Sequence, residues 1–115
     1  MSAQALSLMT LNLTATAAVV KYRAVTMGGA NGAADLLGVS LTDANTGQMF
    51  PVVTHGTAII EAAGAIAAGT KYLTAAADGR AQAGGVVAAC LGKLKPGQSA
   101  SAAGDLVEIV LTPTV

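Results

Sequence analysis

The amino-acid sequence predicts a small all-β domain, and three observations lead to that fold class. The chain has 115 residues, which is the size of a single domain. Short runs rich in valine, leucine, isoleucine and threonine recur along it, and these residues are enriched in strands. Glycine, asparagine and aspartate separate the runs at the close spacing typical of a β-sandwich or a β-barrel.

The N-terminal segment, residues 1–18, carries no charge and places leucine at every second position in two short stretches. A period of two is that of an extended strand. Two interpretations are open: the segment is an extended arm that reaches another protein or a neighbouring copy, or it is the first strand of the β domain of residues 19–115. In the first interpretation the leucines make the contact, namely Leu6, Leu8, Leu11 and Leu13.

Four further β-rich runs follow in the first half of the chain. They read VVKYRAVTM, LLGVSL, QMFPVV and GTAIIE, and the glycine-rich loop of residues 28–35 ends the first of them. We expect turns between the later runs, at residues 43–47 and at His55-Gly56.

The stretch GAIAAGTK, residues 64–71, has the glycine spacing of a phosphate-binding loop, but Thr70 precedes Lys71 where that loop has the reverse order. A phosphate loop also opens a helix. Here Asp78-Gly79, the signature of a tight hairpin turn, follows seven residues after Lys71 and leaves no room for one. We therefore expect residues 71–75 and 80–83 to form a β-hairpin.

A weak internal repeat relates residues 36–53 to residues 90–111. Gly38 and Gly47 in the first copy correspond to Gly92 and Gly104 in the second. Glycine within a strand allows a bulge or a close approach of two backbones. The repeat therefore predicts two similar strand pairs that face each other across a small barrel or sandwich.

The composition predicts a light core and a partner. The chain has 26 alanines and only three aromatic residues, Tyr22, Phe50 and Tyr72. Large aromatic side chains contribute much of the area buried in a typical core. A small domain with a light core often gains stability by association. We therefore expect an oligomer or an attached subunit.

Charge argues against a nucleic-acid partner, because six basic residues balance six acidic ones. The pairs Lys21/Arg23 and Lys93/Lys95 are each spaced by two, which places both charges of a pair on one face of a strand. Such a face is either simply solvated or in contact with an acidic protein surface.

The residues that carry chemistry are scattered. His55 is the only histidine, Cys90 lies among small apolar residues as a buried cysteine does, and the carboxylates fall in turns. We expect no enzyme, no metal site and no cofactor. No signal peptide and no membrane span are expected either, which favours a protein that is intracellular or packaged in a particle made there.

Three further stretches are informative together: LLGVSLTDANTGQMFPVVTHGTAIIEA, AIAAGTKYLTAAADGRAQA, and LGKL with the closing AAGDLVEIVL. They resemble the phage capsid cement or head-decoration proteins that have a small β-barrel or β-tulip core. The shared features fall on residues 37–39, 54–56, 68–72, 78–79 and 104–111, and the resemblance covers about residues 19–112.

The resemblance implies a structural virion protein that binds the outer surface of an expanded phage capsid and stabilises it, as a homotrimer at threefold or quasi-threefold positions. Its partner is then the major capsid protein, with no nucleic acid and no membrane involved. It is made in the host cytoplasm and located on the outside of the virion. The leucines of residues 1–18 would add a strand to a sheet edge on a capsid subunit or a neighbouring copy.

A second function stays open, that of a non-catalytic all-β virion accessory module that binds carbohydrate or a host surface. Carbohydrate sites usually expose aromatic side chains, and the chain has only three. The small number of aromatic residues therefore favours the capsid-binding role.

Overall fold

The computed structural model describes residues 7–33, 36–84 and 91–111, and these residues form strands and loops without a helix. The eight strands are β1 (Ser7–Thr14), β2 (Ala24–Thr26), β3 (Leu36–Ser40), β4 (Met49–Glu61), β5 (Tyr72–Ala75), β6 (Ala81–Ala83), β7 (Gly92–Leu94) and β8 (Leu106–Leu111). The predicted all-β class is confirmed. No helix of the length and apolar character needed to cross a membrane is found in these residues.

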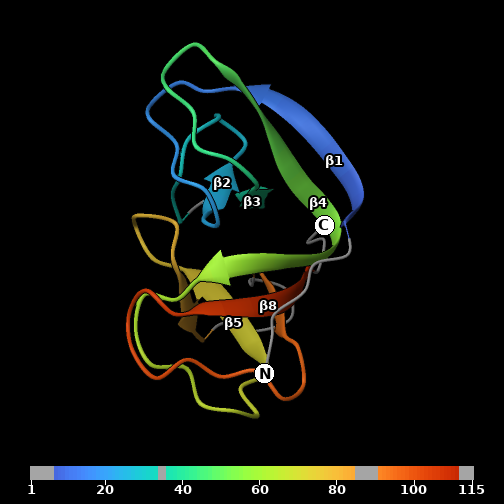
Figure 1. Cartoon of the computed structure of the whole chain (residues 1–115), viewed down its shortest axis with the longest axis vertical. Helices are drawn as coiled ribbons and strands as arrows, with labels where there is room; N and C mark the ends of the chain where they lie inside the picture. Colours follow the sequence, from blue (N-terminus) through green and yellow to red (C-terminus); the bar gives the residue numbers. More distant parts are fainter. Residues whose placement is uncertain (1–6, 34–35, 85–90, 112–115) are drawn as a thin grey trace.

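All strands belong to one antiparallel sheet that has two parts (Figure 1). In the upper part of Figure 1, the first half of β4 pairs with β1 and β3, and β3 pairs with β2. We call β1, β2, β3 and residues 49–56 the β1 layer. In the lower part, residues 57–61 of β4 pair with β8, and the order continues through β7 and β5 to β6. We call residues 57–61 with β5–β8 the barrel.

The barrel nearly closes on itself at the end of β4. Ala62 forms a parallel bridge with Ala81 of β6, and the Ala63 N–H donates to the Ala81 carbonyl at 2.7 Å. The last strand of the order β4-β8-β7-β5-β6 thereby returns to the first, which leaves the barrel little free edge. The predicted small barrel is confirmed.

β4 is the strand that both parts share, and it bends at Gly56. Gly56 has a φ of +96°, a conformation that glycine adopts without steric cost. The register against β1 shifts at the same point, since Ser7 lies opposite Gly56 and Met9 lies opposite His55. Figure 1 shows β4 descending through the upper part and then turning across the lower part. The turn predicted at His55-Gly56 is therefore wrong, because a bulge bends the strand there without ending it.

The two halves of the predicted repeat use glycine in the same way. A Cβ on Gly38 of β3 would lie 2.0 Å from the Val53 carbonyl oxygen of β4, and one on Gly92 of β7 would lie 2.4 Å from the Val110 carbonyl oxygen of β8. Both distances are shorter than any real contact of a Cβ atom. Glycine at these two positions therefore allows the paired strands to approach closely, as the repeat predicted.

The buried apolar side chains form two clusters. The larger one fills the barrel and extends to Ala24, Val39 and Val53, and it includes Ile60, Ile66, Leu73, Val107 and Ile109. The smaller one lies under the β1 layer and includes Val25, Phe50 and Val52, with Leu13 and Leu37 packed against it. Successive residues such as Val52 and Val53 join different clusters because side chains alternate between the faces of a strand.

A network of charged side chains joins the two parts. Glu61, at the end of β4, accepts from Arg23 Nε at 3.3 Å and lies 3.6 Å from Arg80 Nη1. Arg80 Nε also donates to Asp78 Oδ2 at 2.8 Å. The Ala24 N–H donates to the Gly79 carbonyl at 2.7 Å, so the start of β2 rests on the turn between β5 and β6.

The β5–β6 hairpin forms as predicted around Asp78 and Gly79. Ala75 lies opposite Ala81, the Ala76 N–H donates to the Arg80 carbonyl, and Gly79 has a φ of +87°. The stretch before it is a turn in which the Thr70 N–H donates to the Ala67 carbonyl. Lys71 leads directly into β5 and not into a helix, so the rejection of a phosphate loop is confirmed.

Candidate functional site

β1 has a free edge. Seven of its eight residues, all except Leu8, have a partner in β4 on one side, and no other described strand pairs with its second side. The strand contains no charged residue and no proline, which are the residues that usually protect an edge. Backbone N–H and C=O groups along that side are consequently available to a strand from another chain.

The opposite end of the β1 layer is covered. β2 has only three residues, and the residues that follow it fold back over its outer side. Val25 bridges to Asn31, and the Thr26 N–H donates to the Ala30 carbonyl. The bond from Ala24 to Gly79 covers the remaining part. Of the two edges of this layer, β1 is therefore the long and accessible one.

The four leucines predicted to make the N-terminal contact differ in burial, and the structure describes the side chains of only two of them. Leu6 lies outside the described residues, and the side chain of Leu8 is likewise not described. Leu13 lies opposite the buried Phe50 and packs against the smaller cluster. Leu11, opposite Val52, is 38% exposed. Among the leucines whose side chains are described, Leu11 is thus the one available to a partner.

A second feature of the surface is a groove of about 370 Å³ on the barrel. It is lined by Gly69, Thr70, Lys71, Lys93, Leu94, Lys95, Pro96 and Val110, so it lies between the loop that precedes β5 and the strands β7 and β8. Lys93 lies opposite Val110 across the β7–β8 pair. The groove therefore combines lysines with apolar side chains on one surface.

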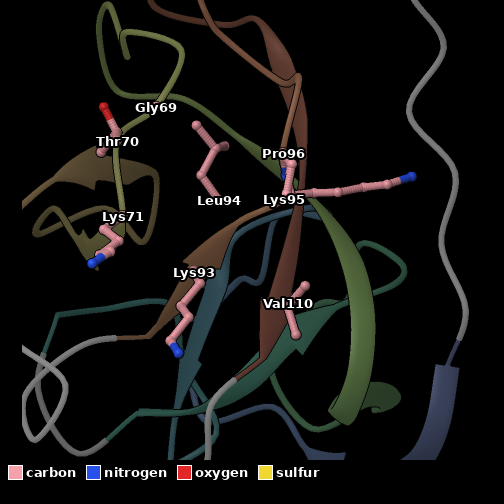
Figure 2. A pocket seen from close by; sticks show the side chains of 8 residues that line it. All are labelled: Gly69, Thr70, Lys71, Lys93, Leu94, Lys95, Pro96 and Val110. Atoms are coloured by element: carbon pink, nitrogen blue, oxygen red, sulfur yellow. The ribbon is translucent and has the colours of Figure 1, made fainter.

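The lysines of the groove occupy different electrostatic environments. Lys95 Nζ lies 3.0 Å from Oε1 of the buried Glu108, which neutralises that pair. No ion pair among the described residues includes Lys71 or Lys93, and both are exposed. In Figure 2, Lys71 and Lys93 point to one side of the groove and Lys95 points to the other.

The remaining polar residues singled out in the sequence have local structural roles. His55 Nδ1 lies 3.0 Å from Thr54 Oγ1, which is the single local hydrogen bond expected of it. Cys90 lies outside the described residues. Within residues 7–33, 36–84 and 91–111, no three histidine, cysteine or acidic side chains lie together in a way that fits a metal ion.

Two carboxylates of the turns are stabilised in their charged form. The backbone N–H of Arg80, 3.1 Å from Asp78 Oδ1, lowers the pKa of Asp78 below its ordinary 3.8, and the Arg80 guanidinium acts in the same direction against partial burial. The backbone N–H and hydroxyl of Ser101, each 2.9 Å from Asp105 Oδ2, lower the pKa of Asp105. Both residues stabilise turns.

Comparison with known proteins identifies a structural neighbour on a phage head. The chain is similar to the N base of the head fibre of bacteriophage phi29, with a TM-score of 0.67 over 90% of this chain and 92% of that one. The fold is that of a phage head-fibre base. Sequence identity between the two is 19%. No protein-family model matches the chain, and no curated protein gives a significant sequence match.

The sequence indicated part of the groove on the barrel. The spacing of Lys93 and Lys95 predicted two charges on one strand face. Both lysines line the groove, but β7 ends before Lys95, which pairs with Glu108 on the side away from Lys93. Lys71 and Val110 join them only through the pairing of β5 with β7 and of β7 with β8. No pattern in the sequence relates positions so far apart, so the groove was not predicted.

Proposed function

We propose that this chain is a structural protein of a bacteriophage particle, bound to the outer surface of the expanded capsid, which it stabilises. The partner is the major capsid protein, and the assembly is a trimer at threefold or quasi-threefold positions. The role requires no catalysis, no cofactor, no nucleic acid and no membrane.

The observation that carries the proposal is the likeness of nearly the whole chain to the base of a phage head fibre. The resemblance of the sequence to head-decoration proteins rests on short motifs between residues 37 and 111. The fold and these motifs both favour a protein of a phage head. At 19% identity the structural comparison supports the fold, and the function is inferred from it.

The free edge of β1 supports the same role. An exposed, uncharged strand edge of this length is a site for β-strand addition, in which main-chain hydrogen bonds supply the affinity. Repetition of one such contact over the copies in a shell multiplies its effect. We therefore place a capsid or neighbour contact at β1, with Leu11 as its exposed side chain.

Co-sedimentation with capsids of the phage that encodes the protein tests the proposal. We expect saturable pelleting with expanded shells, near one copy per capsid subunit, and no pelleting with unexpanded shells. Protein that stays in the supernatant with both shells would contradict the proposal and favour the accessory module that binds carbohydrate or a host surface.

Removal of residues 2–14 tests the contact at β1. We expect loss of shell binding with retention of the barrel, although uncovering Phe50 and Val52 lowers the stability of the β1 layer. Loss of the β circular dichroism spectrum would show instead that the segment belongs to the folding unit.

A point substitution separates binding from folding more sharply. Leu11→Lys puts a charge on the free edge, which blocks strand addition. Val20→Lys is its matched control, because Val20 is 39% exposed and Leu11 is 38% exposed. We expect weaker shell binding for the Leu11 variant alone. Equal binding of both variants would exclude a contact at this edge.

A further inference from the structure

The groove on the barrel has the construction of a peptide-binding site. Its volume of about 370 Å³ is at the small end of the range for ligand pockets, which suits a few side chains of an extended segment. Its apolar part is formed by the exposed Pro96 and Val110, together with Leu94, which belongs to the barrel core and is only 7% exposed. Val110 is 39% exposed although it lies in the central strand pair β7–β8, so an apolar surface is left uncovered there.

The charge of the groove is positive and uncompensated. None of its lining residues is acidic, and Glu108 is committed to Lys95. Lys71 and Lys93 therefore retain their charges beside the apolar surface (Figure 2). A complementary ligand carries carboxylates next to an aliphatic side chain, because each lysine then gains an anion while Val110 and Leu94 gain an apolar contact.

The carboxylates of this chain are unsuited to fill the groove of a second copy. Those in the described residues are already bound within the chain. Glu61, Asp78 and Glu108 form ion pairs, Asp43 accepts from the Lys21 N–H, and Asp105 accepts from Ser101. No carboxylate of the described residues is left for this role, and we therefore take the acidic segment to come from a different protein.

A polypeptide fits this surface better than a nucleic acid. A phosphate backbone is bound by many basic groups, and bases of a single strand stack on aromatic rings. The groove has two unpaired lysines and no aromatic residue, and the whole chain has a net charge of zero. An extended peptide whose acidic and aliphatic residues are two positions apart carries both kinds of side chain on one face, which matches the charge of the groove and its apolar part.

We propose that the groove between residues 69–71, β7 and β8 binds an extended acidic segment of a partner protein. This proposal deepens the proposed function and rests on it for the identity of the partner, which is then the capsid protein. Lys71 and Lys93 bind the carboxylates, and Val110 with Leu94 receives the aliphatic side chain between them.

A synthetic peptide tests the groove without the capsid. Acetyl-Glu-Ser-Val-Ser-Glu-amide, in which Glu, Val and Glu share one face of an extended chain, is titrated into isotope-labelled protein, and the amide chemical shifts are followed by NMR at low salt. We expect shifts concentrated at residues 69–71, 92–95 and 110, and their loss at high salt. Shifts spread over the surface, or shifts of the same size with a single-stranded oligonucleotide, would overturn the proposal.

Charge-reversal variants test whether peptide binding depends on the lysines of the groove. Lys93→Glu and Lys71→Glu are compared with Lys21→Glu, an exposed lysine outside the groove whose reversal changes the net charge equally. We expect peptide affinity to fall about three- to tenfold in each groove variant and to change little in the control. Equal affinities in all three variants would contradict the proposal.

The same variants on expanded shells separate the two proposals. The groove is supported as a capsid contact if the wild-type protein and Lys21→Glu both pellet with the shells, whereas Lys93→Glu is released from them at lower salt. Equal pelleting of all variants would exclude the groove as a capsid contact and leave the proposed function intact. Absence of pelleting by the wild type would reject the proposed function, whereas the peptide titration decides the groove by itself.

Discussion

The β1 layer and the barrel differ in how their strands end and in how much core lies beneath them. The barrel returns from β6 to the end of β4 and encloses the larger apolar cluster. The β1 layer encloses the smaller cluster and ends at the free edge of β1. A closed sheet leaves little backbone for a partner, whereas an open edge offers a row of donors and acceptors. The difference places most of the folding stability in the barrel and the strand-pairing capacity in the β1 layer.

The largest effect on the free energy of unfolding is expected from a glycine-to-alanine substitution at an equivalent position in each part. Gly38→Ala in the β1 layer and Gly92→Ala in the barrel both direct Cβ against a backbone carbonyl of the neighbouring strand. We expect each to destabilise the protein by about 3 kcal/mol or more in urea unfolding. Gly92→Ala should lower protection from hydrogen exchange throughout, and Gly38→Ala should lower it mainly in β1–β3.

Gly64→Ala is the control for that pair. No atom lies within 4 Å of the Cβ that alanine would add at position 64. We expect a change within about 0.5 kcal/mol. A similarly small change for Gly38 or Gly92 would show that the strands separate at little cost, which would contradict the close approach seen here.

A matched pair of valines compares the two clusters directly. Val107 in the larger cluster and Val25 in the smaller one are both fully buried. We expect Val107→Ala to cost about 2–3 kcal/mol and Val25→Ala about 1–2 kcal/mol, because the layer under an open edge collapses more easily around the lost volume. Equal costs, measured by urea unfolding, would show that the two clusters resist cavities alike.

The smallest effect on the free energy of unfolding is expected for Asp78, which lies at the junction of the two parts. Asp78 has a folded pKa below its unfolded value, so its stabilisation is present above about pH 4 and is lost as the pH falls through the folded pKa. We expect Asp78→Asn to be less stable than the wild type near neutral pH. The difference should vanish in acid. A difference in the free energy of unfolding that does not depend on pH would assign the effect to the turn geometry alone.

The sequence predicted most strands better than their connections, although only Ala24–Thr26 of the predicted β-rich run of residues 19–27 forms a strand, because residues 21–23 form a turn. Alternation, turn residues and Asp78-Gly79 located the β5–β6 hairpin, because each is a local signal. His55-Gly56 carried the same local signal of a turn, yet the pairing of β4 with β1 on one side and with β8 beyond it keeps the strand continuous. Partner strands distant in the sequence decide between a turn and a bulge, and a local pattern does not contain them.

The interaction surfaces were predictable to different extents. Leucine spacing and the absence of charge marked β1 as an extended segment before its partner strand was known. The same spacing did not distinguish Leu11 from Leu13, because the contact with Phe50 depends on the register between β1 and β4. The groove required three strands to be aligned, so only the Lys93/Lys95 pair was visible in advance.

The continuity of β4 also has a mechanical consequence. The strand runs from Met49 to Glu61 through both parts, so no linker separates the edge of β1 from the barrel. A tensile load applied to β1 passes through its ladder with β4 into a covalent chain that continues into the barrel, and Arg23 and Arg80 brace the junction at Glu61. The two parts of the molecule, whose longest extent is 38 Å, are therefore joined by a covalent strand as well as by side-chain contacts, and we expect a load on β1 to reach the barrel without passing through a flexible linker.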